Sequence, residues 1–344
     1  MKRFIIAALI VCMLMLLCSC KQEEQTELKI GYISQYDANE NQLTSAILNG
    51  LDLLNSETNT NYKFVKIDES INSSDAIAAL YNNGCRIIIS SEYAVSDAVK
   101  SAQKEYKDCF FACIGYSLSS PADNTVNITF SEHESGFIAG IATALKIQNG
   151  NAAAILGMDL PSTNRYVNGF NLGINYANQH FGTSVTLSSE NIIYIGSYND
   201  PELAKNISEA LYNNDVKCIF TDGGKTSDGI FNAARELRTQ HSDIWVISVE
   251  TDKYDNGILH YNYSVTLTTV LNNYTHVVSN IVARYISNCL SGAKILNYGI
   301  IESGICLPDS NPNLPDDILT KCQEVITKIY EKNLVIPNTE SLLD

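Results

Sequence analysis

Hydrophobic and polar positions follow two alternating patterns from Leu28 to Val249. Short runs that are apolar at nearly every position predict β-strands, and the stretches between them carry apolar residues at helical spacing. Fully apolar strands separated by amphipathic helices indicate parallel sheets that are covered on both faces. The strands are predicted at Leu28–Ile33, Tyr62–Ile67, Cys85–Ser90, Cys109–Ile114, Ala152–Leu156, Asn191–Ile195, Val216–Phe220 and Ile244–Val249. The helices are predicted at Leu43–Leu54, Ser73–Tyr81, Val95–Tyr106, Ser135–Lys146, Tyr166–Gln179, Pro201–Tyr212 and Asp228–Leu237.

This pattern repeats after a short break near residues 131–135, and a length of 344 residues is typical of two domains. We therefore predict an α/β protein of two doubly wound parallel-sheet lobes with a ligand cleft between them. The N-terminal lobe is expected to comprise residues 28–130 with a return segment at 264–292. The C-terminal lobe is expected to comprise residues 131–263 and 293–344.

The first twenty residues have the features of a bacterial lipoprotein signal. A basic start precedes an apolar run over residues 4–17, which is shorter than the roughly 20 residues needed to span a bilayer. The run ends in Leu17-Cys18-Ser19-Cys20, which resembles a lipobox. We predict a signal peptide at 1–19, a lipidated Cys20 and a polar tether at 20–27, which places the protein at the outer face of the cell membrane. The alternative is a plain secretory peptide.

Charge and composition exclude several functions. The 38 acidic and 23 basic residues give a net charge of −15, which repels the phosphates of nucleic acids. With only 5 histidines and no HExxH spacing, we expect no metal site. Ten cysteines occur, and the seven that follow Cys20 include no CxxC pair, so we expect buried free thiols.

The chain carries fragments of catalytic motifs but no complete one. The segment Asp222-Gly-Gly-Lys-Thr226 resembles a phosphate-binding loop, yet Ile219 stands where that loop requires a glycine. No GxSxG nucleophile elbow occurs in the sequence. Gly223 and Gly224 are instead expected to let the backbone approach a small ligand closely. We therefore expect a binding protein without a cofactor rather than an enzyme.

Five motifs follow one another along the chain: Phe137-Ile-Ala-Gly140, Leu156-Gly-Met-Asp-Leu-Pro161, Tyr166-Val-Asn-Gly-Phe-Asn-Leu-Gly173, Ile219-Phe-Thr-Asp-Gly-Gly224 and Thr268-Thr-Val-Leu271. In their order and spacing they resemble the basic membrane protein family, and the resemblance covers nearly all of the chain after the tether. The family comprises substrate-binding lipoproteins of ABC transporters with a type I periplasmic-binding-protein fold, and its characterised members look like purine-nucleoside binders. The resemblance implies a small-molecule ligand and an ABC permease as partner, and we expect a monomer.

The chain departs from the ligand contacts that this resemblance implies. Ser34 stands where the family has a base-contacting Asp, Leu43 where it has a stacking Phe, and Asn272 where it has a Lys. Tyr36 and Asn39, from the same loop as Ser34, are the candidates to compensate. The base-recognition part of the site is therefore expected to differ from that of the family.

Other contacts of the family are retained. Tyr198 matches a second stacking aromatic. The family motif Gly-Val-Asp-x-Asp-Gln reads Ser248-Val-Glu-Thr-Asp-Lys253, so that Glu250 and Asp252 supply acceptors for ribose hydroxyls; a solvated loop or a helix cap is their alternative role. The ligand-binding residues predicted in full are Tyr36, Asn39, Tyr93, Glu132, Asp159, Tyr198, Gly223, Gly224, Glu250, Asp252 and Asn272.

These inferences favour an extracytoplasmic lipoprotein that captures a nucleoside or a related ribosyl compound for an ABC transporter. A surface sensor that uses the same cleft without transport is an alternative from another class. A nucleoside hydrolase is a third hypothesis, and it lacks a recognisable nucleophile or metal constellation.

Overall fold

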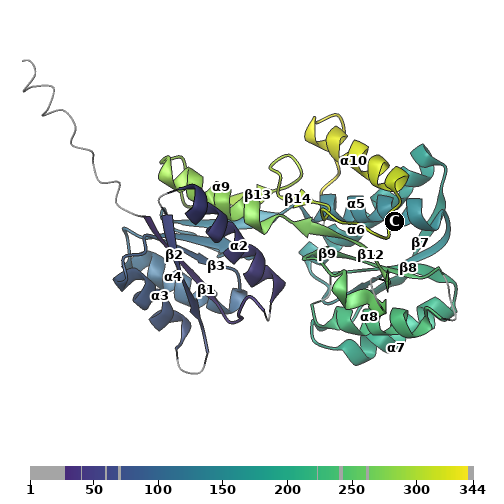
Figure 1. Cartoon of the computed structure of the whole chain (residues 1–344), viewed down its shortest axis with the longest axis horizontal. Helices are drawn as coiled ribbons and strands as arrows, with labels where there is room; N and C mark the ends of the chain where they lie inside the picture. The colour runs from purple at the N-terminus through teal and green to yellow at the C-terminus, as the bar shows by residue number, and fades with distance from the viewer. Residues whose placement is uncertain are drawn as a thin grey trace, which may run out of the picture.

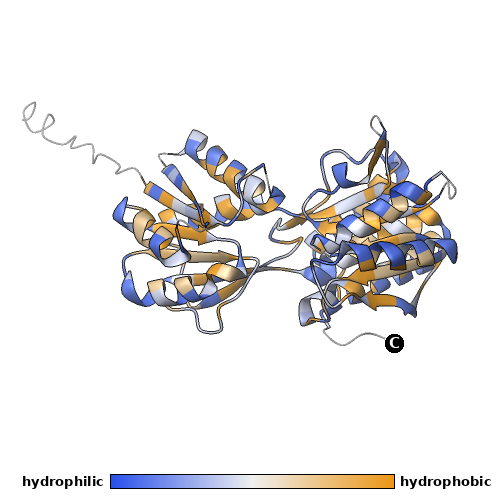
Figure 2. Cartoon of the chain, turned by 90° about the horizontal axis from the view of Figure 1, so that it is seen from below, coloured by the Kyte–Doolittle hydropathy of each residue, from blue (hydrophilic) through white to orange (hydrophobic). Residues whose placement is uncertain are grey.

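Two α/β lobes, connected by short crossings, make up the chain (Figure 1). The predicted class, two lobes with parallel-sheet cores, is confirmed. The strands form the hydrophobic centre of each lobe, and the helices turn their polar faces outward (Figure 2). The computed structural model describes residues 28–39, 41–58, 60–68, 71–222, 224–239, 243–260 and 263–339.

The N-terminal lobe is built on a parallel sheet of strand order β13-β5-β4-β3-β1-β2. Alternate residues of a strand face opposite sides of a sheet, so Ile30 and Tyr32 pack under α2 and α9, while Ile33 packs under α3 and α4. The strands are β1 (Leu28–Ser34), β2 (Thr60–Lys66), β3 (Ile87–Ser90), β4 (Phe110–Ile114), β5 (Thr125–Phe130) and β13 (Lys294–Tyr298). The helices are α2 (Gln42–Glu57), α3 (Ser73–Asn82), η1 (Tyr93–Val95), α4 (Ser96–Glu105) and α9 (Tyr274–Ile286).

The C-terminal lobe repeats this plan in the order β14-β12-β9-β8-β6-β7, with β14 antiparallel. A small hairpin of β10 (Ile258–His260) and β11 (Tyr263–Ser264) follows the 3-10 turn η2 (Asp255–Gly257). The strands are β6 (Asn149–Leu156), β7 (Ser184–Tyr194), β8 (Val216–Thr221), β9 (Trp245–Glu250), β12 (Thr266–Asn272) and β14 (Ile305–Cys306). The helices are α5 (Glu132–Ile147), α6 (Pro161–Phe181), α7 (Pro201–Asn213), α8 (Thr226–Leu237) and α10 (Asp316–Tyr330).

Helices α5 and α6 touch backbone to backbone through glycines. A Cβ at Gly136 would lie 2.0 Å from the carbonyl oxygen of Tyr166, and one at Gly169 would lie 2.1 Å from that of His133. Glycine is therefore required for this close approach. The motif glycines Gly140 and Gly173 have the same role, since a Cβ at each would lie 2.2 Å from Phe170 O and 2.1 Å from Phe137 O.

The chain crosses between the lobes three times within the described residues, after β5, after β12 and after β13. The crossings are bonded to one another. Ser131 N donates to Tyr298 O at 3.2 Å, and Asn273 N donates to Gly304 O at 2.8 Å. The carboxylate of Glu134 accepts from Ile300 N at 2.7 Å. Short crossings of this kind are natural hinges.

The lobe boundaries differ from the prediction in the last third of the chain. The return segment 264–292 divides, because β12 pairs with β9 in the C-terminal sheet and only α9 packs on the N-terminal lobe (Figure 1). Residues 294–298, expected in the C-terminal lobe, instead pair with β5 as strand β13. The local sequence does not indicate the pairing of β12 with β9 or of β13 with β5, because the paired strands are far apart in sequence.

Two other predictions meet the structure only in part. All seven described cysteines are free, as expected, but Cys289 is exposed and Cys306 is only half-buried. Among the described residues, each helix is too short or too polar to cross a membrane. The predicted signal peptide and Cys20 lie outside the described residues.

Candidate functional site

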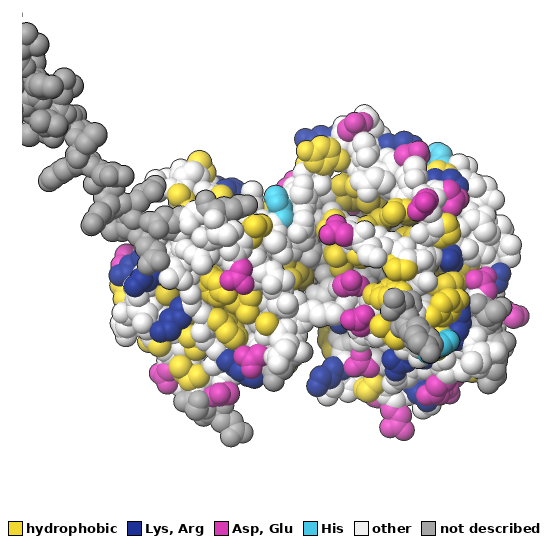
Figure 3. All heavy atoms as spheres, viewed as in Figure 1, with side chains coloured by type: hydrophobic (Ala, Val, Ile, Leu, Met, Phe, Trp, Pro, Cys, Tyr) yellow, Lys and Arg dark blue, Asp and Glu magenta, His cyan; other side chains and the backbone are white. Residues whose placement is uncertain are grey.

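A cleft of about 720 Å³ separates the lobes at the carboxyl ends of their central strands. The molecular surface is hollowed at this position (Figure 3). Tyr274, at the start of α9, lies at its base. We refer to the N-terminal wall as Tyr36, Asn41, Gln42 and Leu43. We refer to the C-terminal wall as Tyr198, Asn199, Gly224, Lys225, Asp228, Glu250, Thr251, Lys253 and Asn256.

The N-terminal wall is a loop that is held by a carboxylate from another strand. Ser34 is fully buried at the end of β1, and its hydroxyl donates to Glu92 Oε1 at 2.6 Å. Glu92 Oε2 accepts from Gln35 N at 2.9 Å, and Tyr36 N donates to Ser34 Oγ at 3.0 Å. Glu92 follows β3, the strand beside β1, so the sheet brings an acid to the position where the sequence lacks one. This network directs Tyr36 into the cleft.

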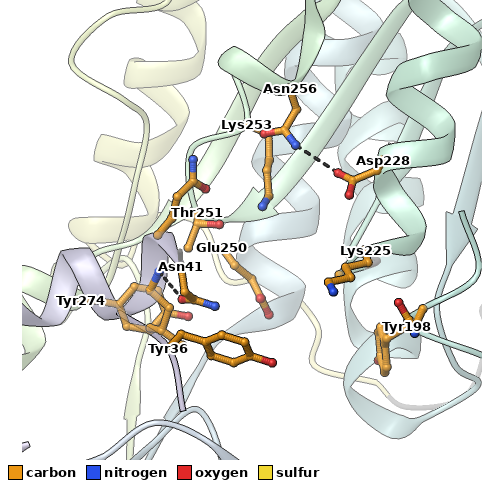
Figure 4. A pocket seen from close by; sticks show the side chains of 14 residues that line it. Tyr36, Asn41, Tyr198, Lys225, Asp228, Glu250, Thr251, Lys253, Asn256 and Tyr274 are labelled. Carbon is orange, nitrogen blue, oxygen red and sulfur yellow. Dashed lines mark hydrogen bonds between the residues drawn. The ribbon is translucent and has the colours of Figure 1, made fainter. Parts of the chain in front are cut away.

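The start of α2 completes this wall. The side chain of Asn41 accepts from Leu43 N at 2.8 Å and from Thr44 N at 3.1 Å, which is an N-cap of the helix. Its amide group remains available to a ligand in the cleft (Figure 4). Leu43 presents only an aliphatic surface in place of the stacking ring that the family resemblance implies.

Glu250 is the central acid of the C-terminal wall. It ends β9 with a φ of 76°, a left-handed conformation that is rare outside glycine and typical of functional sites. Its Oε1 accepts from the Tyr166 hydroxyl at 3.3 Å. The side chain is accessible from the cleft, yet surrounding protein groups desolvate the carboxylate and raise its pKa, while Tyr166 and the charge of Lys253 oppose that rise.

Asp222 lies behind this wall at the end of β8. Its Oδ1 accepts from Gly157 N at 3.1 Å, which ties β8 to the end of β6. Burial raises the pKa of the Asp222 carboxyl to about 7, and the nearby charge of Glu250 acts in the same direction. The two acids therefore influence each other electrostatically, although only Glu250 lines the cleft.

Tyr198 supplies the aromatic face of the C-terminal wall. Its ring lies so close to Gly157 that a Cβ there would be 2.2 Å from the ring, so glycine is required at this position. Desolvation raises the pKa of Tyr198, and the phenol stays neutral. Tyr36 and Tyr198 are 42% and 39% exposed, and they come from opposite lobes (Figure 4).

Four of the predicted ligand-binding residues line the cleft: Tyr36, Tyr198, Gly224 and Glu250. Two of the others are occupied elsewhere. Glu132 forms an ion pair with Arg165 at 3.0 Å, and Asp252 accepts from Tyr254 N at 2.9 Å and so caps a turn. Gly223 lies outside the described residues.

The remaining predicted residues also lie outside the cleft lining. Asn272 is buried and donates to the Tyr274 hydroxyl at 3.1 Å, and Asp159 accepts from Asn164 Nδ2 at 3.1 Å. Tyr93 is exposed and packs edge-on against Tyr116, and Asn39 is an exposed loop residue. Hydrogen bonds to neighbouring residues engage Asn272 and Asp159, and a ring contact engages Tyr93.

Sequence reasoning did not single out several polar residues of the C-terminal wall as ligand contacts. Lys225, Asp228, Lys253 and Asn256 all line the cleft, and Asn256 Nδ2 donates to Asp228 Oδ1 at 3.1 Å. Their positions shortly after β8 and β9 are the signal that could have found them. Among the described residues, no group of three or more His, Cys, Asp or Glu is arranged to hold a metal ion.

Comparisons with known proteins agree with this architecture. A family model described as "ABC transporter substrate-binding protein PnrA-like" matches residues 29–340. The "CD4+ T-cell-stimulating antigen" of Listeria monocytogenes is 23% identical over 294 residues, which cover 84% of this chain and 77% of that protein. The "ABC transporter nucleoside-binding protein BmpA" of Lactococcus lactis is 21% identical over 327 residues, 91% of this chain and 90% of that protein.

The same architecture occurs among solved structures. An ABC transporter solute-binding protein from Aeropyrum pernix K1 aligns with a TM-score of 0.66 and 19% identity, over 90% of this chain and 94% of that one. A likeness at this identity supports the fold alone. The periplasmic-binding-protein architecture predicted from the sequence is thereby confirmed.

Proposed function

The chain belongs to the family of PnrA-like ABC transporter substrate-binding proteins, and from this premise we propose that it captures a nucleoside or related ribosyl compound in the cleft between its lobes. A relative named as a nucleoside-binding protein supports the ligand class. An ABC permease receives the ligand, as the family implies.

One observation carries the proposal: the two lobes each contribute an aromatic face to the same cleft. Tyr36 projects from the N-terminal wall and Tyr198 from the C-terminal wall, with Glu250 between them (Figure 4). Two flat faces on opposite sides suit a planar base, and each stacking contact contributes about 0.5–1.5 kcal/mol. Glu250 accepts hydrogen bonds from ribose hydroxyls, and the amides of Asn41 and Asn256 contribute further polar contacts.

The ligand class is tested by a thermal-shift screen of nucleosides, nucleobases and pentoses on the full chain. A ligand at 100 times its Kd stabilises the native state by about 2.7 kcal/mol and raises the melting temperature by several degrees. Nucleosides are expected to give the largest shifts. Shifts only with amino acids, peptides or metal ions would contradict the proposal.

Closure of the lobes completes capture. The three crossings at Ser131, Asn273 and residues 299–304 absorb the backbone rotation, and the walls meet on the ligand. Small-angle scattering with and without a saturating ligand from the screen is expected to show compaction. An unchanged radius of gyration would indicate a rigid module instead.

Lipid attachment at Cys20 holds the protein at the membrane, as the lipobox-like motif supports. Cys20→Ala is expected to move the protein into the soluble fraction and to remove the mass of the lipid. Membrane association with unchanged mass in this variant would contradict lipidation.

A further inference from the structure

Two lysines of the C-terminal wall, Lys225 and Lys253, face the cleft. Lys225 follows β8 and Lys253 follows β9, and both ammonium groups point into the cavity (Figure 4). Among the residues that the structure describes, neither ammonium group donates a hydrogen bond or lies within 4.0 Å of a carboxylate.

Some lysines of the described residues pair with acids: Lys66 lies 2.9 Å from Asp37, Lys205 lies 2.7 Å from Glu236, and Lys321 lies 3.8 Å from Asp317. Exposed pairs of this kind form readily where an acid is within reach. The two cleft lysines present positive charge to whatever enters, and the charge of Lys253 also acts on the Glu250 carboxylate.

The acids that face these lysines are held by other groups. Glu250 accepts from Tyr166 and Asp228 accepts from Asn256. Asp222 lies behind the wall and accepts from Gly157 N. Burial raises the pKa of the Asp222 carboxyl to about 7, so that this acid carries less negative charge than an exposed aspartate.

Lys225 and Lys253 come from the loops that follow the neighbouring strands β8 and β9, and both line the same cleft.

Resting on the proposed ribosyl ligand, we propose that this ligand carries a phosphate monoester, as in a nucleoside monophosphate, which Lys225 and Lys253 bind together. A phosphate monoester carries about −1.5 to −2 charges at pH 7, which matches two ammonium groups. A single carboxylate would leave one lysine uncompensated. Lysine binds phosphate as a mobile point charge, so two long side chains on separate loops can close on it.

The test is calorimetric titration of the full chain in detergent with matched pairs: adenosine and AMP, guanosine and GMP, uridine and UMP. The variants are K225Q, K253Q and the double variant, with K321Q as the control because Lys321 is an exposed lysine on α10 away from the cleft. At least one monophosphate is expected to bind about tenfold or more tightly than its nucleoside. Each cleft variant is expected to weaken monophosphate binding by about tenfold and to weaken nucleoside binding by a smaller factor.

The outcomes separate the two proposals. Nucleosides that bind as tightly as their monophosphates, or monophosphate binding that the cleft variants leave unchanged, would overturn the phosphate site while the nucleoside function stands. Failure of every nucleoside and monophosphate to bind would overturn both. Weaker monophosphate binding in high salt, with unchanged nucleoside binding, would support the phosphate site. Melting temperatures of the variants, which alter only surface side chains of the cleft, verify that each one is folded.

Discussion

The two walls of the cleft differ in charge and in construction. The N-terminal wall lines the cleft with uncharged side chains, whereas the C-terminal wall carries Lys225, Asp228, Glu250 and Lys253. The two sheets are alike except for the antiparallel strand β14, yet among the described lining residues only those of the C-terminal lobe are charged. The comparison indicates a division of roles: the N-terminal wall supplies shape and an aromatic face, and the C-terminal wall supplies charge and hydrogen bonds.

The walls also differ in what supports them. The N-terminal wall is a loop anchored by hydrogen bonds to Glu92. Behind the C-terminal wall, the backbone contact of α5 with α6 fixes Tyr166, and Tyr166 in turn donates to Glu250. Backbone contacts in a packed core deform less than a surface loop, so we expect the C-terminal wall to be the more rigid of the two.

The largest effect is expected from Gly136→Ala, which disrupts the backbone contact between α5 and α6. Alanine gains about 1 kcal/mol of helix propensity over glycine, but its Cβ would lie 2.0 Å from the Tyr166 carbonyl oxygen. The cost of overpacking exceeds the gain in helix propensity, and we expect a net loss of about 3 kcal/mol in the free energy of unfolding. Urea denaturation measures it, and Asn175→Ala at an exposed site on α6 is the control, with a change within about 0.5 kcal/mol. Equal stability of both variants would contradict the backbone contact.

The second effect concerns Asp222, whose folded-state pKa of about 7 exceeds its usual value of 3.8. A raised pKa means that the folded state binds the proton more tightly, so stability falls as the pH rises from about 4 to about 7. A shift of this size corresponds to about 4 kcal/mol, and we expect about half of it because the side chain keeps some solvent access.

The measurement is thermal unfolding of Asp222→Asn and of the unmodified chain between pH 4 and pH 8. Asparagine keeps an acceptor for Gly157 N but does not titrate. Relative to the unmodified chain, the variant is therefore expected to gain stability as the pH rises. A difference that is constant with pH would contradict the raised pKa of Asp222.

The third effect sharpens the contrast in charge. Glu250→Gln removes the charged acceptor of the C-terminal wall and is expected to weaken binding of the screened ligand by about 10- to 100-fold, because hydrogen bonds to charged groups contribute about 1.5–3 kcal/mol. Asp252→Asn, two residues away and engaged in a turn, is the matched control. Calorimetry is expected to show little change for the control. Equal losses of affinity in both variants would mean that Glu250 and Asp252 both contact the ligand, as the family resemblance implies.

The smallest effect is expected in the N-terminal wall. Tyr36→Ala removes one aromatic face and is expected to weaken binding by about 2- to 10-fold, whereas Tyr36→Phe keeps the ring and the affinity. Tyr93→Ala, at an exposed tyrosine outside the cleft lining, is the control. Loss of binding in Tyr36→Phe would show that the hydroxyl, and not the ring, makes the contact.

Sequence reasoning located the acids of the site better than their roles. Glu250, a predicted ligand contact, ends β9 and lines the cleft, and its place directly after an apolar run is a signal in the sequence. Asp252 shares the same motif, but its carboxylate bonds to a backbone N–H two residues on. Glu92 carried no signal at all, because its relation to Ser34 depends on the pairing of β3 with β1.

The sequence by itself determined the two-lobed α/β class and the order of its central strands and helices. Hydrophobic periodicity is sufficient for these features, because the spacing of apolar residues along a segment indicates whether it is a strand or a helix and whether one or both of its faces are buried. Only the tertiary structure decided that β12 and β13 belong to opposite lobes from those expected, and that two lysines converge on one space. These features depend on contacts between residues far apart in sequence, which local patterns do not encode.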